Sequence, residues 1–126
     1  MRLLLGAMLF GSVANAHHAL DAVYNLKTEV PLEGKLVQVL IRNPHSFLHL
    51  EVLDKDGITR RWALELPGAN SLRKHGLEHE TLKAGDEIAV IMNPPLKPGE
   101  LRGSLTSLNR ESDGFTWRAK APRRSK

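Results

Sequence analysis

The chain has 126 residues, a net charge of +4 with neutral histidines, and no cysteine. This length is enough for one small domain, and without cysteine the chain holds neither disulfide bonds nor a cysteine-ligated zinc site. The sequence has no nucleophile elbow, phosphate-binding glycine-rich loop or His-Glu-x-x-His helix, so the common enzyme classes built on those motifs are excluded and a protein that is not an enzyme is favoured.

The first sixteen residues have the three parts of a secretory signal peptide. Met1-Arg2 is a short positive start, residues 3–13 carry no charge, and Ala14-Asn15-Ala16 is a small-x-small cleavage site. The apolar run is shorter than the roughly 20 residues that a membrane-spanning helix needs. We expect residues 1–16 to be removed, with a cut after Ala14 as the alternative, and the mature protein to be periplasmic or secreted without a transmembrane segment.

Alternating apolar residues predict six short strands after residue 24, at 32–41, 47–53, 58–66, 87–92, 101–108 and 115–117. In the first of them Leu36 and Gln38 are expected to share a face, and Gly34 to mark a bulge or tight bend. Asp54-Lys55-Asp56-Gly57 predicts a hairpin turn between the second and third.

One helical turn is expected between the third and fourth strands. It would cover residues 72–75, capped by Asn70 or Ser71 and stopped by Gly76. Five or six short antiparallel strands with one short helix predict an all-β fold, a small, partly open antiparallel barrel similar to the OB-fold. The single barrel domain is expected at residues 17–117. Residues 118–126 carry five basic side chains and no apolar periodicity, which predicts a disordered tail that folding does not need.

Cleavage after Ala16 would make His17 the first residue of the mature protein. Its free α-amine and its imidazole could then close a chelate ring on one metal ion, and His45 could supply a third nitrogen, because the Asn43-Pro44 turn fixes its direction. Such a nitrogen set suits Cu(II). His18 could supply this third nitrogen instead of His45, or could be exposed to solvent, and both N-terminal histidines could also be ordinary solvated side chains.

Three further residues are candidates to support or bind near this site. Glu65, at the end of the third predicted strand, could accept a hydrogen bond from a metal-binding histidine or form a surface ion pair with Arg73. Asn43 precedes the proline that directs His45.

Several segments together resemble a known family. They are HHAL after the signal peptide, LEGKLVQVLIRNPHSFLHLEV, DKDGITRRWALEL, NSLRKHGL and LKAGDEIAVIMNPP. In order and spacing they are similar to the small secreted bacterial family called domain of unknown function 6152, over about residues 17–108. The resemblance implies an exported β-rich domain and no particular activity. The family's motif residues fall on His17, His18, Asn43, Pro44, His45, Trp62, Glu65, Leu72, Gly76, Gly85 and Asp86.

Two function classes follow. The first is an exported, non-enzymatic β-barrel that binds a transition metal, copper first, through His17 and His45 with His18 auxiliary. The second is a metal-free interaction module that engages an envelope protein or an anionic lipid surface. A metal-dependent oxidase is a third, weaker hypothesis. Nucleic acid is not expected as a partner, because the chain is predicted to be exported and has only six aromatic residues.

Overall fold

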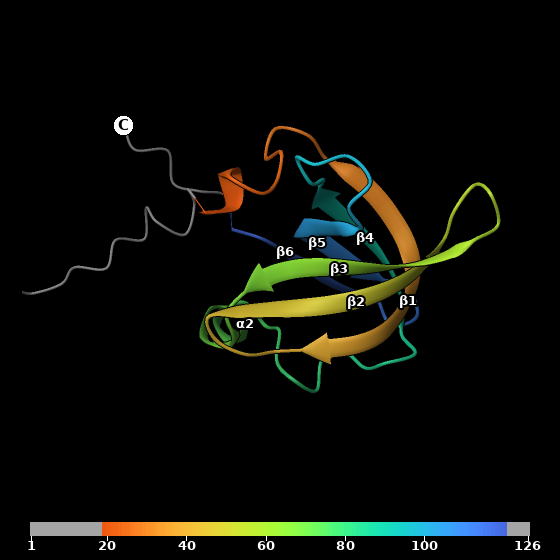
Figure 1. The fold of residues 1–126 in the computed structure, drawn as a ribbon. Helices are drawn as coiled ribbons and strands as arrows, with labels where there is room; N and C mark the ends of the chain where they lie inside the picture. The colour runs from red at the N-terminus through yellow and green to blue at the C-terminus, as the bar shows by residue number, and fades with distance from the viewer. Residues whose placement is uncertain (1–18, 121–126) are drawn as a thin grey trace, which may run out of the picture.

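Six strands and the short helix α2 form the barrel in the computed structural model, which describes residues 19–120 and begins with a helical turn at residues 19–21 (Figure 1). The elements are β1 (Val30–Leu40), β2 (His45–Leu53), β3 (Thr59–Pro67), α2 (Ala69–Lys74), β4 (Glu87–Asn93), β5 (Arg102–Arg110) and β6 (Phe115–Arg118). The predicted signal peptide, His17, His18 and residues 121–126 lie outside the described residues. No helix within residues 19–120 is long and apolar enough to cross a membrane.

The strands close into a barrel. The sheet runs in the order β3-β2-β1-β4-β5-β6, and β3 also pairs with β5 in parallel, from Ala63↔Arg102 to Glu65↔Ser104. The first half of β5 therefore meets β3, while its second half pairs with β6. The predicted all-β, OB-fold-like barrel with a helix between its third and fourth strands is confirmed. Its closure by a parallel pair makes it a closed mixed barrel, whereas the sequence predicted a partly open antiparallel one.

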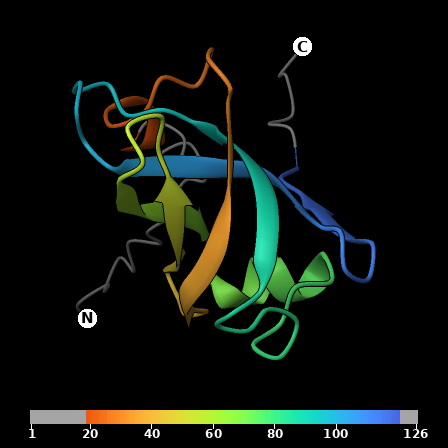
Figure 2. The ribbon, with the colours of Figure 1, turned by 90° about the vertical axis from the view of Figure 1, so that its right-hand side faces the viewer.

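The core lies inside this barrel and consists mainly of leucine. The fully buried apolar side chains of β1, β2 and β3 are Leu36, Leu48, Leu50, Leu64 and Leu66. One end of the barrel is covered by α2, whose Leu72 is also buried (Figure 2). Because inward and outward side chains alternate along each strand, the odd-numbered residues of β2 and the facing residues of β3 lie on the outer surface.

A bulge in β1 changes which residues face the core. The register shift against β2 falls between Leu36 and Gln38, so Val37 is the extra residue and the bulge is not at Gly34. Gln38 therefore turns outwards, where its side-chain oxygen accepts a hydrogen bond from Arg61 (2.9 Å). The prediction that Leu36 and Gln38 share a face was wrong for this reason. Gly34 instead allows close approach of strands, since a Cβ there would meet the backbone oxygen of Glu51.

The helix α2 begins earlier than predicted and has no cap from its own side chains. Gly68 is the N-cap residue, and both Asn70 and Ser71 lie inside the helix, so the predicted caps were wrong. The predicted stop at Gly76 is confirmed. Gly76 has φ +84°, its N–H donates to the Arg73 carbonyl (3.2 Å), and the Leu77 N–H donates to the Leu72 carbonyl (3.0 Å). These two bonds form a Schellman motif, which needs a left-handed residue such as glycine.

Residues 19–29 form an N-terminal arm outside the strands. The Asn25 N–H donates to the Pro94 carbonyl and the Leu96 N–H to the Val23 carbonyl (2.9 Å each), so the arm lies against the loop after β4 (Figure 1). At the other end of the chain, β6 includes Arg118, and the Ala119 N–H donates to the Thr106 carbonyl (2.8 Å). Ordered pairing thus extends two residues beyond the predicted domain end at residue 117.

Candidate functional site

His45 is the first residue of β2 and lies on the outer face of the barrel. It directly follows Asn43-Pro44, whose peptide bond is cis. The β2–β3 register places Phe47 opposite Glu65, so His45 lies diagonally from that carboxylate. Its Nδ1 is 3.2 Å from Glu65 Oε1, and the His45 side chain is 43% exposed. The imidazole is thus oriented by a neighbour and still open to solvent.

The turn that directs His45 is held from both sides. The fully buried Ser46 hydroxyl donates to the Arg42 carbonyl and accepts from the Arg42 N–H (3.1 Å each). On the other side, a Cβ at Gly68 would come within 2.6 Å of both Asn43 Oδ1 and the Pro44 carbonyl oxygen. The start of β2 is therefore fixed by close packing, which limits the movement of His45.

Glu65 has a partner for each of its two carboxylate oxygens. Oε1 lies beside His45, and Oε2 accepts a hydrogen bond from the Tyr24 hydroxyl (2.7 Å). The Glu65 side chain is 19% exposed. Tyr24 belongs to the N-terminal arm and is 3% exposed. Burial and then the bond to Glu65 raise the pKa of Tyr24 well above its ordinary value, so the phenol stays protonated and donates.

Arg102, at the start of β5, completes the surroundings of Tyr24. Its guanidinium lies 6.0 Å from the centre of the Tyr24 ring, and its Nε is 2.6 Å from Glu100 Oε2. The site therefore joins the N-terminal arm, β2, β3 and β5 at the place where β3 and β5 close the barrel. Sequence reasoning missed Tyr24 and Arg102. The one available signal was that Tyr24 is the single tyrosine of the chain.

This arrangement has a recognised chemical use. Histidines that bind metals usually donate their second ring N–H to a carboxylate or carbonyl, which fixes the tautomer and raises ligand basicity. A neutral His45 with its proton on Nδ1, facing Glu65, presents a lone pair on Nε2. No group of three or more His, Asp or Glu side chains within residues 19–120 is placed to hold a metal ion.

The remaining candidate residues lie in different places. Asn43 turns towards α2, where its Oδ1 accepts from the Asn70 N–H (3.4 Å). Arg73 is exposed and lies in the last turn of α2. Among the described residues, the ion-pair partner of Glu65 is His45 and not Arg73. His17 and His18 fall outside the described residues. The structure thus brings Glu65 to His45 and leaves Arg73 apart from them.

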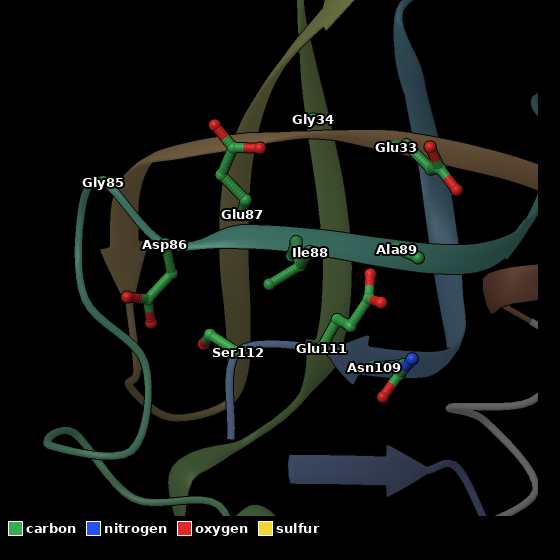
Figure 3. A pocket seen from close by; sticks show the side chains of 10 residues that line it. All are labelled: Glu33, Gly34, Gly85, Asp86, Glu87, Ile88, Ala89, Asn109, Glu111 and Ser112. Carbon is green, nitrogen blue, oxygen red and sulfur yellow. The ribbon is translucent and has the colours of Figure 1, made fainter. Parts of the chain in front are cut away.

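A shallow groove of about 660 Å³ lies elsewhere on the barrel (Figure 3). It runs between β1, β4 and the turn after β5, and four of its lining residues are acidic: Glu33, Asp86, Glu87 and Glu111. Asp86 is already engaged by Arg110, whose Nη1 lies 2.7 Å away. The groove shares no residue with the His45 site, and an acidic lining by itself identifies no ligand.

The sequence matches the model of the Family of unknown function (DUF6152) over residues 7–105. The chain belongs to this family. The match includes every residue of the site formed by Tyr24, His45, Glu65 and Arg102, and it ends within β5. The resemblance to DUF6152 expected from the sequence motifs is confirmed.

The comparison with curated proteins found no match. Among solved structures, the crystal structure of the mitochondrial single-stranded DNA-binding protein Rim1 from S. cerevisiae is similar to this DUF6152 chain at 10% sequence identity and a TM-score of 0.49. The similarity covers 67% of this chain and 93% of that one. A likeness at this level does not indicate what the DUF6152 chain binds, so the expected absence of a nucleic-acid partner stays a prediction.

Proposed function

We propose that this DUF6152 protein is an exported, non-enzymatic binding protein that holds a copper ion between its N-terminal histidines and His45. One observation carries the proposal, the line of contacts from His45 Nδ1 through the Glu65 carboxylate to the Tyr24 hydroxyl, at 3.2 and 2.7 Å. Both Glu65 oxygens are engaged by these neighbours. The carboxylate therefore acts as the orienting partner of His45, and Nε2 is the nitrogen that binds the metal.

Only a short length of chain separates the N-terminal histidines from Tyr24, which contacts the His45 site. The N–H groups of Val23 and Tyr24 both donate to the Leu20 carbonyl (3.0 and 2.8 Å), so the chain from Leu20 to Tyr24 makes one helical turn. At about 1.5 Å per residue this turn spans roughly 6 Å, and three extended residues back to His17 add at most about 11 Å. Because the Tyr24 hydroxyl contacts Glu65, the partner of His45, a chain of this length is compatible with His17 and His45 sharing one metal ion.

The expected ligands favour copper. With the signal peptide removed after Ala16, His17 supplies an α-amine and an imidazole nitrogen that form a chelate ring, and His45 adds one more imidazole. Cu(II) favours tetragonal nitrogen ligation and binds such sites more tightly than the other common divalent metals. His18 is an auxiliary ligand. We expect Zn(II) to bind more weakly than Cu(II).

The test is a Cu(II) titration of exported protein whose intact mass shows that it starts at His17. Four forms are compared: native, extended by one residue before His17, His45→Ala, and the control His49→Ala, which removes another outer-face histidine of β2 beside Arg61. We expect the extension and His45→Ala each to lower Cu(II) affinity at least tenfold, because each removes a ligand, and His49→Ala to leave it unchanged.

Equal Cu(II) affinities for the native and His45→Ala proteins would contradict the proposal, since the terminus would then bind alone as any His-His peptide does. A mature chain that starts at a residue other than His17 would also contradict it, because the chelate ring needs that amine. In either case the metal-free module that binds an envelope protein or an anionic lipid surface becomes the better hypothesis.

A further inference from the structure

Tyr24 attaches the N-terminal arm to the barrel. The neighbouring backbone bonds of the arm go to residues 94–96, which belong to a loop and not to a strand. The arm contacts the barrel strands through the Thr28 carbonyl, which accepts a hydrogen bond from Asn93 Nδ2 of β4 (2.9 Å). At the site itself the contact comes from the Tyr24 hydroxyl on Glu65 and from the Tyr24 ring beside Arg102. A buried hydroxyl donating to a carboxylate forms a charge-assisted hydrogen bond, which is stronger than a neutral one.

Glu65 links this attachment to His45. One oxygen of the same carboxylate holds the arm and the other orients the imidazole. The N-terminal histidines begin only a few residues before Tyr24 in the sequence. A metal ion that joins His17 to His45 therefore draws the arm onto the same face of the barrel as the Tyr24 hydroxyl does.

We infer that Tyr24 is a positioning residue that couples docking of the N-terminal arm to metal binding at His45. The inference rests on the proposed function. By thermodynamic linkage the coupling acts in both directions. A docked arm increases the affinity for the metal because residues 19–29 no longer have to be ordered when the metal binds, and bound metal decreases opening of the arm. Removing the Tyr24 hydroxyl weakens both effects while leaving every metal ligand in place.

The experiment uses Tyr24→Phe, which keeps the buried ring and deletes the hydroxyl. We expect Cu(II) affinity to fall about tenfold, the size typical for losing a group that orients a metal ligand. Amide hydrogen exchange at Asn25 and Leu96 should be faster in metal-free Tyr24→Phe than in the metal-free native protein. In the native protein Cu(II) should slow that exchange, and the nitrogen splitting in the Cu(II) electron paramagnetic resonance spectrum should change between the two forms.

Two further variants isolate the coupling. Thr106→Val deletes another part-buried hydroxyl, which donates to the Ile91 carbonyl (2.9 Å), and should change neither Cu(II) affinity nor exchange of the arm. Combining Tyr24→Phe with His45→Ala tests the route, because an effect transmitted through His45 disappears once that ligand is gone. An equal loss with and without His45 would overturn the inference.

The outcomes separate this inference from the proposed function. If His45→Ala lowers Cu(II) affinity and Tyr24→Phe leaves affinity, spectrum and exchange unchanged, the coupling is wrong and the metal site stands. If His45→Ala has no effect on Cu(II) binding, the metal function fails and the coupling fails with it. Comparing amide hydrogen exchange at Asn25 and Leu96 in metal-free native and Tyr24→Phe proteins then still shows whether the Tyr24 hydroxyl holds the arm against the barrel.

Discussion

Arg110 shows how a single side chain joins separate parts of the barrel. Its guanidinium donates to both oxygens of Asp113 (2.9 and 2.7 Å), to Asp86 Oδ2 (2.7 Å) and to the Thr81 carbonyl (2.7 Å). It also lies 5.3 Å from the centre of the Phe115 ring. The Arg110 side chain is 13% exposed. The end of β5, the turn into β6 and the loop before β4 are therefore tied together by one cation.

The Arg110 hydrogen bonds lower the pKa of the Asp113 carboxyl to about 2, and this predicts a pH-dependent stability. A folded-state pKa below the ordinary value of about 3.9 means that the unfolded chain takes up a proton more readily. The contribution of Asp113 is thus present above about pH 4 and is lost as the pH falls towards 2. We expect Asp113→Asn to be less stable than the native protein at pH 7 and equal to it near pH 2, in urea unfolding. A difference that does not vary with pH would contradict this assignment.

At the scale of elements, α2 and the loop before β2 support each other. The Ala69 N–H donates to the Arg42 carbonyl (3.0 Å), and the Asn70 N–H to Asn43 Oδ1 (3.4 Å). The first turn of the helix thus obtains acceptors from a loop some 27 positions earlier in the chain. The same loop directs His45, so the helix end and the candidate site share one packed junction.

This junction predicts different results for two small substitutions. Asn43→Ala should cost about 0.5–1 kcal/mol in the free energy of unfolding, because a helix-end N–H loses its side-chain acceptor. The sequence predicts Ser71 as a helix cap, but the structure places it inside α2. The free energy of unfolding of Ser71→Ala should therefore stay within about 0.5 kcal/mol of the native value. Urea unfolding of both variants measures this. A greater cost for Ser71→Ala would mean that the helix starts later than the structure shows.

At the scale of the whole molecule, the candidate site depends on closure of the barrel. Tyr24 comes from the arm, His45 from β2, Glu65 from β3 and Arg102 from β5. These segments meet where β3 and β5 pair in parallel. A chain that loses this closure also loses the arrangement that orients His45, so occupancy of the site and stability of the barrel should be linked.

Cu(II) should therefore raise the free energy of unfolding. A ligand that binds only the folded state adds about 2.7 kcal/mol at a hundredfold excess over its dissociation constant, and the rise is smaller here because the unfolded chain keeps the His17 amine and imidazole. The rise should be lost in His45→Ala and should shrink as the pH falls, since protons compete for amine and imidazole nitrogens. Urea unfolding with and without Cu(II) at two pH values measures it. An equal rise in native and His45→Ala proteins would place the metal away from His45.

Features that depend on residues close together along the chain could be predicted from the sequence. Alternation of apolar side chains located the strands, and Gly57 and Gly76 marked a hairpin and a helix end because left-handed backbone favours glycine. The pattern of short strands around one helix indicated the OB-fold-like barrel. The prediction that a carboxylate on the third strand could serve His45 rested on residue type and on strand alternation, both of which are local.

The tertiary structure decided what depends on residues far apart in the chain. Strand register and barrel closure determine three such features. The bulge falls at Val37, Asn43 accepts a hydrogen bond from α2, and Tyr24 donates to Glu65, 41 positions away. The sequence allowed Glu65 to pair with either His45 or Arg73. The register of β2 against β3 places Glu65 beside His45. Local sequence determines the conformation of each segment, but the distance between two side chains on different strands is set by how all the strands pack around a common core.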